Sequence, residues 1–126
     1  MRKAHDLMVN AFWGGYGKRK ANDVVARTAF ISGPQQMEWY YHGHRIAWSQ
    51  LDTESGIHVS FCGYGTYSTK ARLNALMDKF GYQRFYQKDF RIYYGLVPIE
   101  VARCYDIEEL DQYNKHLEKV TSVAAA

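Results

Sequence analysis

The chain has 126 residues, which is the size of one domain and too small for two separate hydrophobic cores. Hydrophobic residues make up 47% and charged residues 23%, so the composition is that of a folded protein rather than a disordered one. The net charge of +3 does not by itself mark a nucleic-acid-binding protein. No apolar run approaches the roughly 20 residues of a membrane span, and Met1–Asp6 leads into no secretory signal. We therefore expect a soluble, cytoplasmic single domain that makes no contact with a membrane.

The chain has only two cysteines, Cys62 and Cys104, and they stand far apart in no metal-binding or redox spacing. A secreted disulfide scaffold of this size carries more. We expect both to be small buried hydrophobic residues, with a single bridge between them as the alternative.

The N-terminal segment predicts an amphipathic helix followed by a basic connector. Apolar residues recur there at helical spacing, namely Ala4, Leu7, Met8, Ala11 and Phe12. Gly14 and Gly15 are typical of a helix end. Residues 15–20 then predict a flexible, basic connector.

The next part of the chain predicts strands joined by short turns. Residues 24–31 favour a strand, and 36–41 and 45–50 favour a hairpin around His42-Gly43. Residues 57–61 alternate apolar and polar side chains, as a half-buried strand does.

The period then changes to that of a central helix. Its apolar stripe ends at Gly81, Ser68 or Thr69 is the expected cap, and the stripe consists of Leu73, Leu76, Met77 and Phe80. A second hairpin over residues 84–94 and a short strand around Val101 follow.

A C-terminal helix is predicted from residue 106 to residue 120. Asp106 and Glu109 are spaced as a capping box, and the apolar stripe consists of Ile107, Leu110, Tyr113, Leu117 and Val120. Acidic residues stand at its start and basic residues at its end, as the helix dipole favours. Residues 121–126 predict a frayed tail.

These elements predict an α+β fold: an antiparallel meander sheet with an N-terminal helix, a central helix packed on the sheet and a C-terminal helix. We expect one domain over residues 1–126. It divides into a helix and basic connector (1–21), a sheet with the central helix (22–105) and the C-terminal helix (106–120).

Sequence signatures of enzymes are absent, including the nucleophile elbow, the zinc-protease helix and the Walker and dinucleotide-binding loops. His42 and His44 would need a third ligand to hold a metal, so we interpret them as exposed turn residues. We expect no catalysis, no metal site and no cofactor.

The most informative segment runs from Gly63 to Arg72, from a strand into the start of the central helix. A helix start offers free N–H groups and a positive dipole to an anion. Hydroxyls and cations follow there in succession, namely Thr66, Ser68, Thr69, Lys70 and Arg72. This pattern predicts a phosphate site, although one capping hydroxyl with solvated cations would also account for it.

The second hairpin interleaves basic and aromatic residues, which suits phosphate contact and base stacking, although alternate aromatics would also be explained as core. The predicted phosphate-binding set is Thr66, Ser68, Thr69, Lys70, Arg72, Asn74, Arg84 and Arg91. The predicted stacking residues are Tyr86 and Tyr93.

Three segments carry a resemblance to a known group of proteins. Residues 42–47 follow the pattern HGxxIA, residues 63–74 follow GxxTxTTxxRLN, and residues 86–90 follow a Q-K-aromatic strand. Over about residues 22–94 the chain resembles a small phage-encoded domain of unknown function. Ser68 departs from the first threonine of the TT pair but keeps the hydroxyl. More faintly, the chain is similar to phage anti-Thoeris sponge proteins, a likeness that implies sequestration of a signalling nucleotide without cleavage.

The leading hypothesis is a non-catalytic phage counter-defence protein in the cytoplasm of the infected host, which sequesters a phosphate-bearing ligand such as a signalling nucleotide. On this hypothesis, Arg72→Ala weakens ligand binding without unfolding the domain. One alternative is an inhibitor that binds a host protein through Trp13, Trp39 or Trp48. The other is a small DNA- or RNA-binding protein. A homo-oligomer is expected because small sheets have edges to cover.

Overall fold

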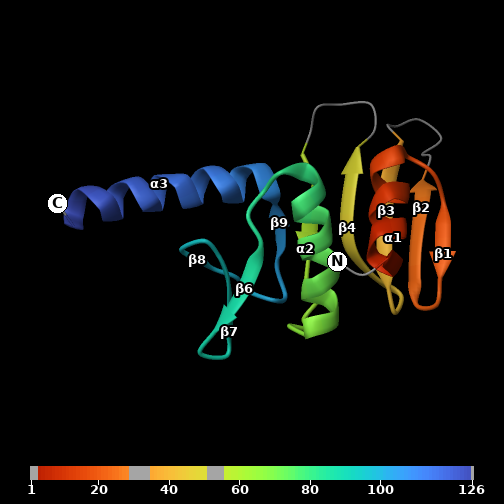
Figure 1. Cartoon of the computed structure of the whole chain (residues 1–126), viewed down its shortest axis with the longest axis horizontal. Helices are drawn as coiled ribbons and strands as arrows, with labels where there is room; N and C mark the ends of the chain where they lie inside the picture. The colour runs from red at the N-terminus through yellow and green to blue at the C-terminus, as the bar shows by residue number, and fades with distance from the viewer. Residues whose placement is uncertain (1–2, 29–34, 51–55, 126) are drawn as a thin grey trace.

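The computed structural model describes residues 3–28, 35–50 and 56–125 (Figure 1). The helices are α1 (Lys3–Gly14), α2 (Tyr67–Phe80) and α3 (Ile107–Ala125). The strands are β1 (Lys18–Lys20), β2 (Asp23–Thr28), β3 (Gln36–Tyr41), β4 (His44–Gln50), β5 (His58–Ser60), β6 (Phe85–Lys88), β7 (Arg91–Tyr94), β8 (Val97–Pro98) and β9 (Cys104–Asp106).

The fold is α+β, and the expected antiparallel meander is confirmed. A six-stranded sheet has the order β1-β2-β3-β4-β5-β9, and β6-β7-β8 form a separate three-stranded sheet. Helices α1 and α2 lie side by side, α1 over β1–β3 and α2 over β4 (Figure 1). The small sheet contacts α2 through β6 and α3 through β7 and β8.

The core lies between these two helices and the large sheet. Trp39 and Val59 are fully buried from the sheet side, and Leu76 and Phe12 meet them from α2 and α1. Strand alternation places these sheet residues on the face that the helices cover. Burial of so many large apolar side chains is the main stabilising contribution to a domain of this size.

The buried stripe of α1 agrees with the predicted one at Met8, Ala11 and Phe12 but differs from it at Leu7. Leu7 is 43% exposed, whereas Met8, Val9 and Phe12 are buried. Both stripes have helical spacing, so the sequence pattern alone does not choose between them. Packing against α2 determines which residues are buried, because the ring of Phe80 in α2 contacts the ring of Phe12 and also lies 4.6 Å from the ring of Trp13.

The basic segment expected to be a flexible connector is in part a strand. Lys18, Arg19 and Lys20 form β1, which pairs with Val25, Val24 and Asp23 of β2. All three β1 side chains are exposed. The strand satisfies backbone groups of β2 that would otherwise lie at the edge of the sheet.

Helix α2 begins at least two residues earlier than the predicted caps allow. Thr66 is the N-cap, in extended conformation, and its hydroxyl accepts from the Thr69 N–H at 3.2 Å. The prediction of Ser68 or Thr69 as the cap is therefore wrong, since both lie inside the helix. Gly81 ends α2 in the left-handed conformation, with φ of 81°, as predicted.

The predicted second hairpin turns at Asp89 and Phe90, and both residues have positive φ, 52° and 66°. Its strand β6 is attached to α2 by Asn74. The Asn74 amide donates to the Phe85 carbonyl and accepts from the Phe85 N–H, at 2.9 and 2.6 Å. The strand expected around Val101 is absent at that place, because Val101 lies in a turn between β8 and β9.

Helix α3 confirms Asp106 as its cap, because the Asp106 carboxylate accepts from the N–H groups of Glu108 and Glu109. The helix continues to Ala125, so the predicted boundary at residue 120 and the frayed tail are wrong over residues 121–125. Its C-terminal end extends beyond the rest of the chain (Figure 1).

Both cysteines are free, and Cys104 is exposed while Cys62 is half-buried. The prediction that both are buried is therefore wrong. Among the described residues, no helix is long and apolar enough to cross a membrane.

The outer face of the large sheet holds a buried carboxylate, Glu38, which is 6% exposed. It accepts from Arg45 at 2.8 Å and from the Thr28 hydroxyl at 2.5 Å. Burial alone would raise the pKa of Glu38, but the hydrogen bonds from Thr28, Arg45 and Tyr40 outweigh burial and hold this pKa below its usual range.

We predict that Glu38→Gln lowers the free energy of unfolding by about 1–3 kcal/mol at pH 7, because the charge-assisted bonds are lost. A lowered pKa in the folded state stabilises the protein above the ordinary carboxyl pKa, and this contribution disappears as the pH falls through the folded pKa. In urea unfolding at pH 7 and at progressively lower pH, the free energies of unfolding of the wild type and Glu38→Gln should therefore converge. Glu108→Gln, on an exposed residue, is the control. A difference independent of pH would contradict the prediction.

Candidate functional site

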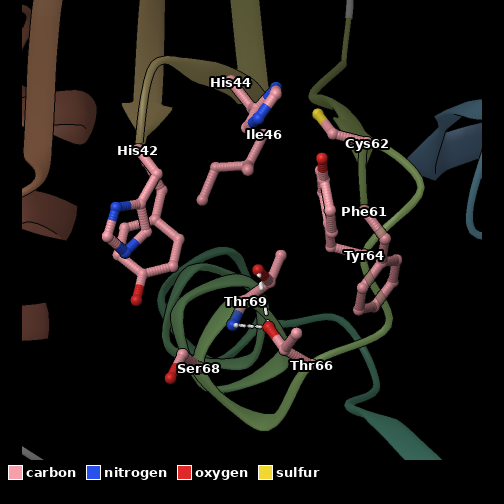
Figure 2. Close-up of a pocket in the computed structure, with 10 residues that line it drawn as sticks. His42, His44, Ile46, Phe61, Cys62, Tyr64, Thr66, Ser68 and Thr69 are labelled. Carbon is pink, nitrogen blue, oxygen red and sulfur yellow. Dashed lines mark hydrogen bonds between the residues drawn. The ribbon is translucent and has the colours of Figure 1, made fainter.

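A cavity of about 300 Å³ lies between the start of α2, the β3–β4 turn and the loop after β5 (Figure 2). Its lining combines rings, hydroxyls and apolar side chains. The lining residues are Tyr41, His42, His44, Ile46, Phe61, Cys62, Tyr64, Thr66, Ser68 and Thr69.

The first turn of α2 forms one side of this cavity. The hydroxyls of Thr66 and Thr69 lie 3.1 Å apart, and Figure 2 shows Thr66, Thr69 and Ser68 together on this side. The N–H groups of Tyr67 and Ser68 precede the first helical bond, from Lys70 N–H to the Thr66 carbonyl, so they have no acceptor within the helix. This side of the cavity is suited to an anionic group.

Aromatic rings form two further sides. The rings of Tyr41 and His42 have centroids 4.4 Å apart, and those of His44 and Tyr64 lie 5.1 Å apart. Figure 2 shows His42 and Tyr64 on opposite sides of the cavity. The β3–β4 turn places the imidazoles there, because His42 and Gly43 both have positive φ, 51° and 77°. Such a two-residue turn is the tight kind that joins adjacent antiparallel strands.

The interior of the cavity is apolar. Ile46 and Phe61 are almost fully buried. Cys62 has a positive φ of 55°, and its thiol donates to the Arg45 carbonyl at 3.1 Å. An apolar interior with polar groups at one end is the usual character of a small-molecule site.

Arg72, a predicted phosphate ligand, is engaged elsewhere. Its guanidinium donates to both carboxylate oxygens of Asp23, at 2.7 and 2.9 Å, and lies 3.7 Å from the centre of the Tyr41 ring. Asp23 also accepts from the Trp39 indole at 2.9 Å. The Arg72 and Asp23 side chains are only 14% and 8% exposed. Arg72 therefore connects α2 to the sheet beside the cavity and does not line it.

The structure divides the remaining predicted residues between two further places. Four of them line a second groove of about 590 Å³ together with Tyr67, namely Lys70, Asn74, Arg84 and Tyr86. In that groove Lys70 lies near the Tyr67 ring and Arg84 pairs with Asp78. Arg91 and Tyr93 belong to β7, where the Tyr93 ring stacks on Tyr86 at 5.6 Å. Of the predicted set, the structure brings only Thr66, Ser68 and Thr69 to the cavity.

Sequence reasoning missed the aromatic sides of the cavity. His42 and His44 are both exposed, as predicted, but only His42 lies in the turn, since His44 is the first residue of β4. Both line the cavity with Tyr64 and the start of α2. The available signal was two short glycine-containing turns that flank neighbouring strands, at Gly43 and Gly63. These two turns can be recognised as parts of one site only when the strand order is known.

The tryptophans proposed as anchors for a protein partner differ in their surroundings. Trp39 is fully buried, so its proposed role as a surface anchor is wrong. Trp48 lies between the Arg45 guanidinium and the His58 ring. Trp13 is 53% exposed. The side chain most available to a partner is Phe90, which is 100% exposed at the turn of the second hairpin.

The fold and the cavity define a small α+β domain with a ring-lined cavity at a helix start. The chain belongs to a phage protein family, the Kyanoviridae Gp96 proteins, whose family model matches residues 1–116. No curated protein and no solved structure matches the chain. The expectation of a small phage-encoded domain is thus confirmed, and the resemblance to nucleotide sponges stays a prediction.

We predict that Arg72→Ala lowers the free energy of unfolding by about 3–5 kcal/mol, because it leaves Asp23 as a buried, unpaired charge. The measurement is equilibrium denaturation beside the exposed-residue control Arg91→Ala, for which we expect less than about 0.5 kcal/mol. Equal stability of Arg72→Ala and the wild type would show that the ion pair does not hold α2. Because of this expected loss, Arg72→Ala is not a clean test of ligand binding.

Proposed function

We propose that this phage protein binds and sequesters a small phosphate-bearing ligand, and that the ligand is a nucleotide used as a signal by the infected host. The observation that carries the proposal is the cavity itself, with aromatic rings on two sides and the first turn of a helix on a third. Sequestration in the host cytoplasm would serve counter-defence, in keeping with the resemblance to nucleotide sponges.

The dimensions and chemistry of the cavity fit this ligand class. A volume of about 300 Å³ is at the lower end of the range for small-molecule sites. A planar base would lie between the Tyr41–His42 and His44–Tyr64 ring pairs, where stacking contributes about 1–3 kcal/mol. The phosphate would accept from N–H groups of the first turn of α2 and from the Ser68 hydroxyl.

The same lining favours binding without catalysis. Among the described residues that line the cavity there is no carboxylate, lysine or arginine. The Thr66 hydroxyl is used in capping α2 and lies in hydrogen-bond contact with Thr69. A hydroxyl nucleophile would need a base placed to take its proton, and the bases that line the cavity, His42 and His44, pack against the rings of Tyr41 and Tyr64. We therefore propose that the ligand leaves unchanged.

The first experiment is native mass spectrometry of protein purified from the bacterial host. We expect a retained mass of a few hundred daltons per subunit, because a sequestering protein holds its ligand through purification. Apo protein would then be mixed separately with linear mononucleotides, with cyclic mono- and dinucleotides and with inorganic phosphate, and its mass measured again. A protein that is empty after purification and binds none of these probes would contradict the proposal.

Two substitutions assign the ligand to the cavity. Ser68→Asp introduces a negative charge at the helix start, where an acidic side chain stabilises the helix but repels a phosphate. We expect at least about a tenfold loss of nucleotide affinity, which corresponds to about 1.4 kcal/mol, with folding intact. Tyr64→Ala, which removes one ring, should weaken the binding of nucleotides about fivefold to a hundredfold and leave the affinity for inorganic phosphate unchanged.

Each substitution has a matched control on an exposed residue outside the cavity. Ser122→Asp introduces the same change on α3, and Tyr16→Ala removes a similarly exposed ring. Binding titrations of the four variants should separate the two cavity substitutions from the two controls. Nucleotide binding that survives Ser68→Asp and Tyr64→Ala would place the ligand elsewhere.

A specific observation favours a second candidate function, inhibition of a host protein. Phe90 is fully exposed although it is large and apolar, and its φ of 66° is one that a non-glycine residue adopts at a cost. A hairpin of this turn type would be better served by glycine at that position. A strained, exposed aromatic residue is a suitable anchor for a pocket on a partner protein.

We predict that Phe90→Gly raises the free energy of unfolding by up to about 1 kcal/mol, because the turn strain is removed. If Phe90 anchors a partner, the same variant loses the host proteins that the wild type retains in affinity capture. Leu96→Ala, at another exposed apolar residue, controls for lost surface hydrophobicity. Destabilisation by Phe90→Gly, or unchanged capture, would remove the reason for this candidate.

The nucleic-acid alternative rests on the second groove, where Lys70 and Arg84 lie near the rings of Tyr67 and Tyr86. Phosphodiester binding there would weaken steeply with salt. Measurement of DNA and RNA affinity at increasing ionic strength therefore distinguishes this alternative from nucleotide binding in the cavity.

A further inference from the structure

The second half of α3 presents an apolar face to solvent. Asn114 makes the contact that ties the middle of the helix to the small sheet, where it accepts from the Leu96 N–H at 2.7 Å. On the exposed side, Tyr113 and Val120 are 54% and 50% exposed. The end of the helix extends past the rest of the described chain (Figure 1).

The exposed residues continue a regular pattern. Leu110, Tyr113, Leu117 and Val120 follow one another at intervals of three, four and three residues. This is the spacing at which two helices pack along a common seam. Along this stripe Leu110 is buried and Leu117 is half-buried against the core, whereas Tyr113 and Val120 are exposed, so packing within one chain accounts for only part of it.

A groove of about 400 Å³ runs beside the start of the same helix. Leu110 and Tyr113 line it, together with Val97, Pro98 and Tyr105. The charged residues of the groove are mostly acidic: Glu100, Asp106 and Glu109 lie there with the single cation Arg103. The groove is therefore a partly apolar channel with a net negative charge, and the apolar stripe of α3 begins in it.

The two halves of α3 have opposite charge. The first half carries Glu108, Glu109 and Asp111, and the second half carries Lys115 and Lys119 against Glu118 alone. Antiparallel pairing of two such helices sets each acidic half beside a basic half, whereas parallel pairing sets like charges together. The helix is thus complementary to a reversed copy of itself.

We infer that two copies of this chain form an antiparallel dimer through α3, in which the second half of each helix lies in the groove beside the start of the other. In this register Leu110 meets Val120 of the partner subunit, and Tyr113 meets Leu117 of the partner subunit. The occupant is a second copy because the apolar lining and the net negative charge of the groove match the apolar stripe and the basic residues of the second half of α3. The β1 edge of the large sheet is a poor alternative, since β1 consists of Lys-Arg-Lys, which opposes strand addition.

The test is the mass in solution by sedimentation or light scattering over about a hundredfold range of concentration. We expect a dimer for the wild type and a monomer for Tyr113→Glu/Val120→Glu. Both residues are half-exposed, so folding should survive, which circular dichroism checks. Gln112→Glu/Ser122→Glu adds the same two charges at exposed positions outside the stripe and should stay dimeric. A monomeric wild type, or a dimeric Tyr113→Glu/Val120→Glu, would overturn the inference.

Zero-length carbodiimide cross-linking tests the direction of pairing. Glu109 and Lys119 are ten residues apart, or about 15 Å along one helix, which is too far for a direct amide bond within a chain. We expect this cross-link between subunits of the wild-type dimer and its loss in Tyr113→Glu/Val120→Glu. Cross-links confined to residues near one another in the same chain, from a sample shown to be dimeric, would exclude the antiparallel arrangement.

Discussion

The arrangement of this domain depends on one buried carboxylate. Asp23, at the start of β2, accepts from Arg72 of α2 and from Trp39 of β3, so a single side chain joins two strands and a helix. Ionised groups out of contact with water are stable only when hydrogen bonds replace their hydration, and here the guanidinium is paired with both oxygens. The stacking of Arg72 on Tyr41 fixes the rotation of α2, and hence the distance between the helix start and the turn that carries His42.

The cavity therefore results from rigid neighbours rather than from a flexible loop. Its ring pairs are carried by tight turns with left-handed residues, His42 and Cys62, while its polar side is a capped helix. Left-handed backbone in a residue with a side chain costs about 1 kcal/mol or more. The surrounding sheet and helix offset this cost, and a site preorganised in this way loses little entropy when a ligand enters.

The sequence was sufficient for the fold because the order of the elements is nearly the order of the contacts. Strands β1 to β5 pair with their neighbours in the chain, so local alternation and turn residues predict most of the sheet. Competition between similar local signals explains the errors. Thr66, rather than Ser68 or Thr69, caps α2, and two overlapping apolar stripes were available to α1.

The site was less predictable because its contacts are distant in sequence. Arg72 meets Asp23 across 49 residues, and nothing local indicates this ion pair. Six of the predicted phosphate residues lie close together within residues 66–74, but successive residues of a helix point about 100° apart. Ser68 and Thr69 consequently face the cavity, Lys70 and Asn74 face the second groove, and one motif serves two surfaces.

Strand β9 comes late in the chain although it pairs with β5, and this has a consequence for how the domain folds. Residues 61–103, with α2 and the small sheet, lie between the paired strands β5 and β9, whereas β1 to β5 form from contacts that are close in the chain. Loop-closure entropy makes the meander the faster unit to form and the docking of α2 the slower one. The cavity spans the junction of these two units and is complete only when both are in place. A molecule bound in the cavity would bind only the fully folded state, and would therefore stabilise the product of the last folding step.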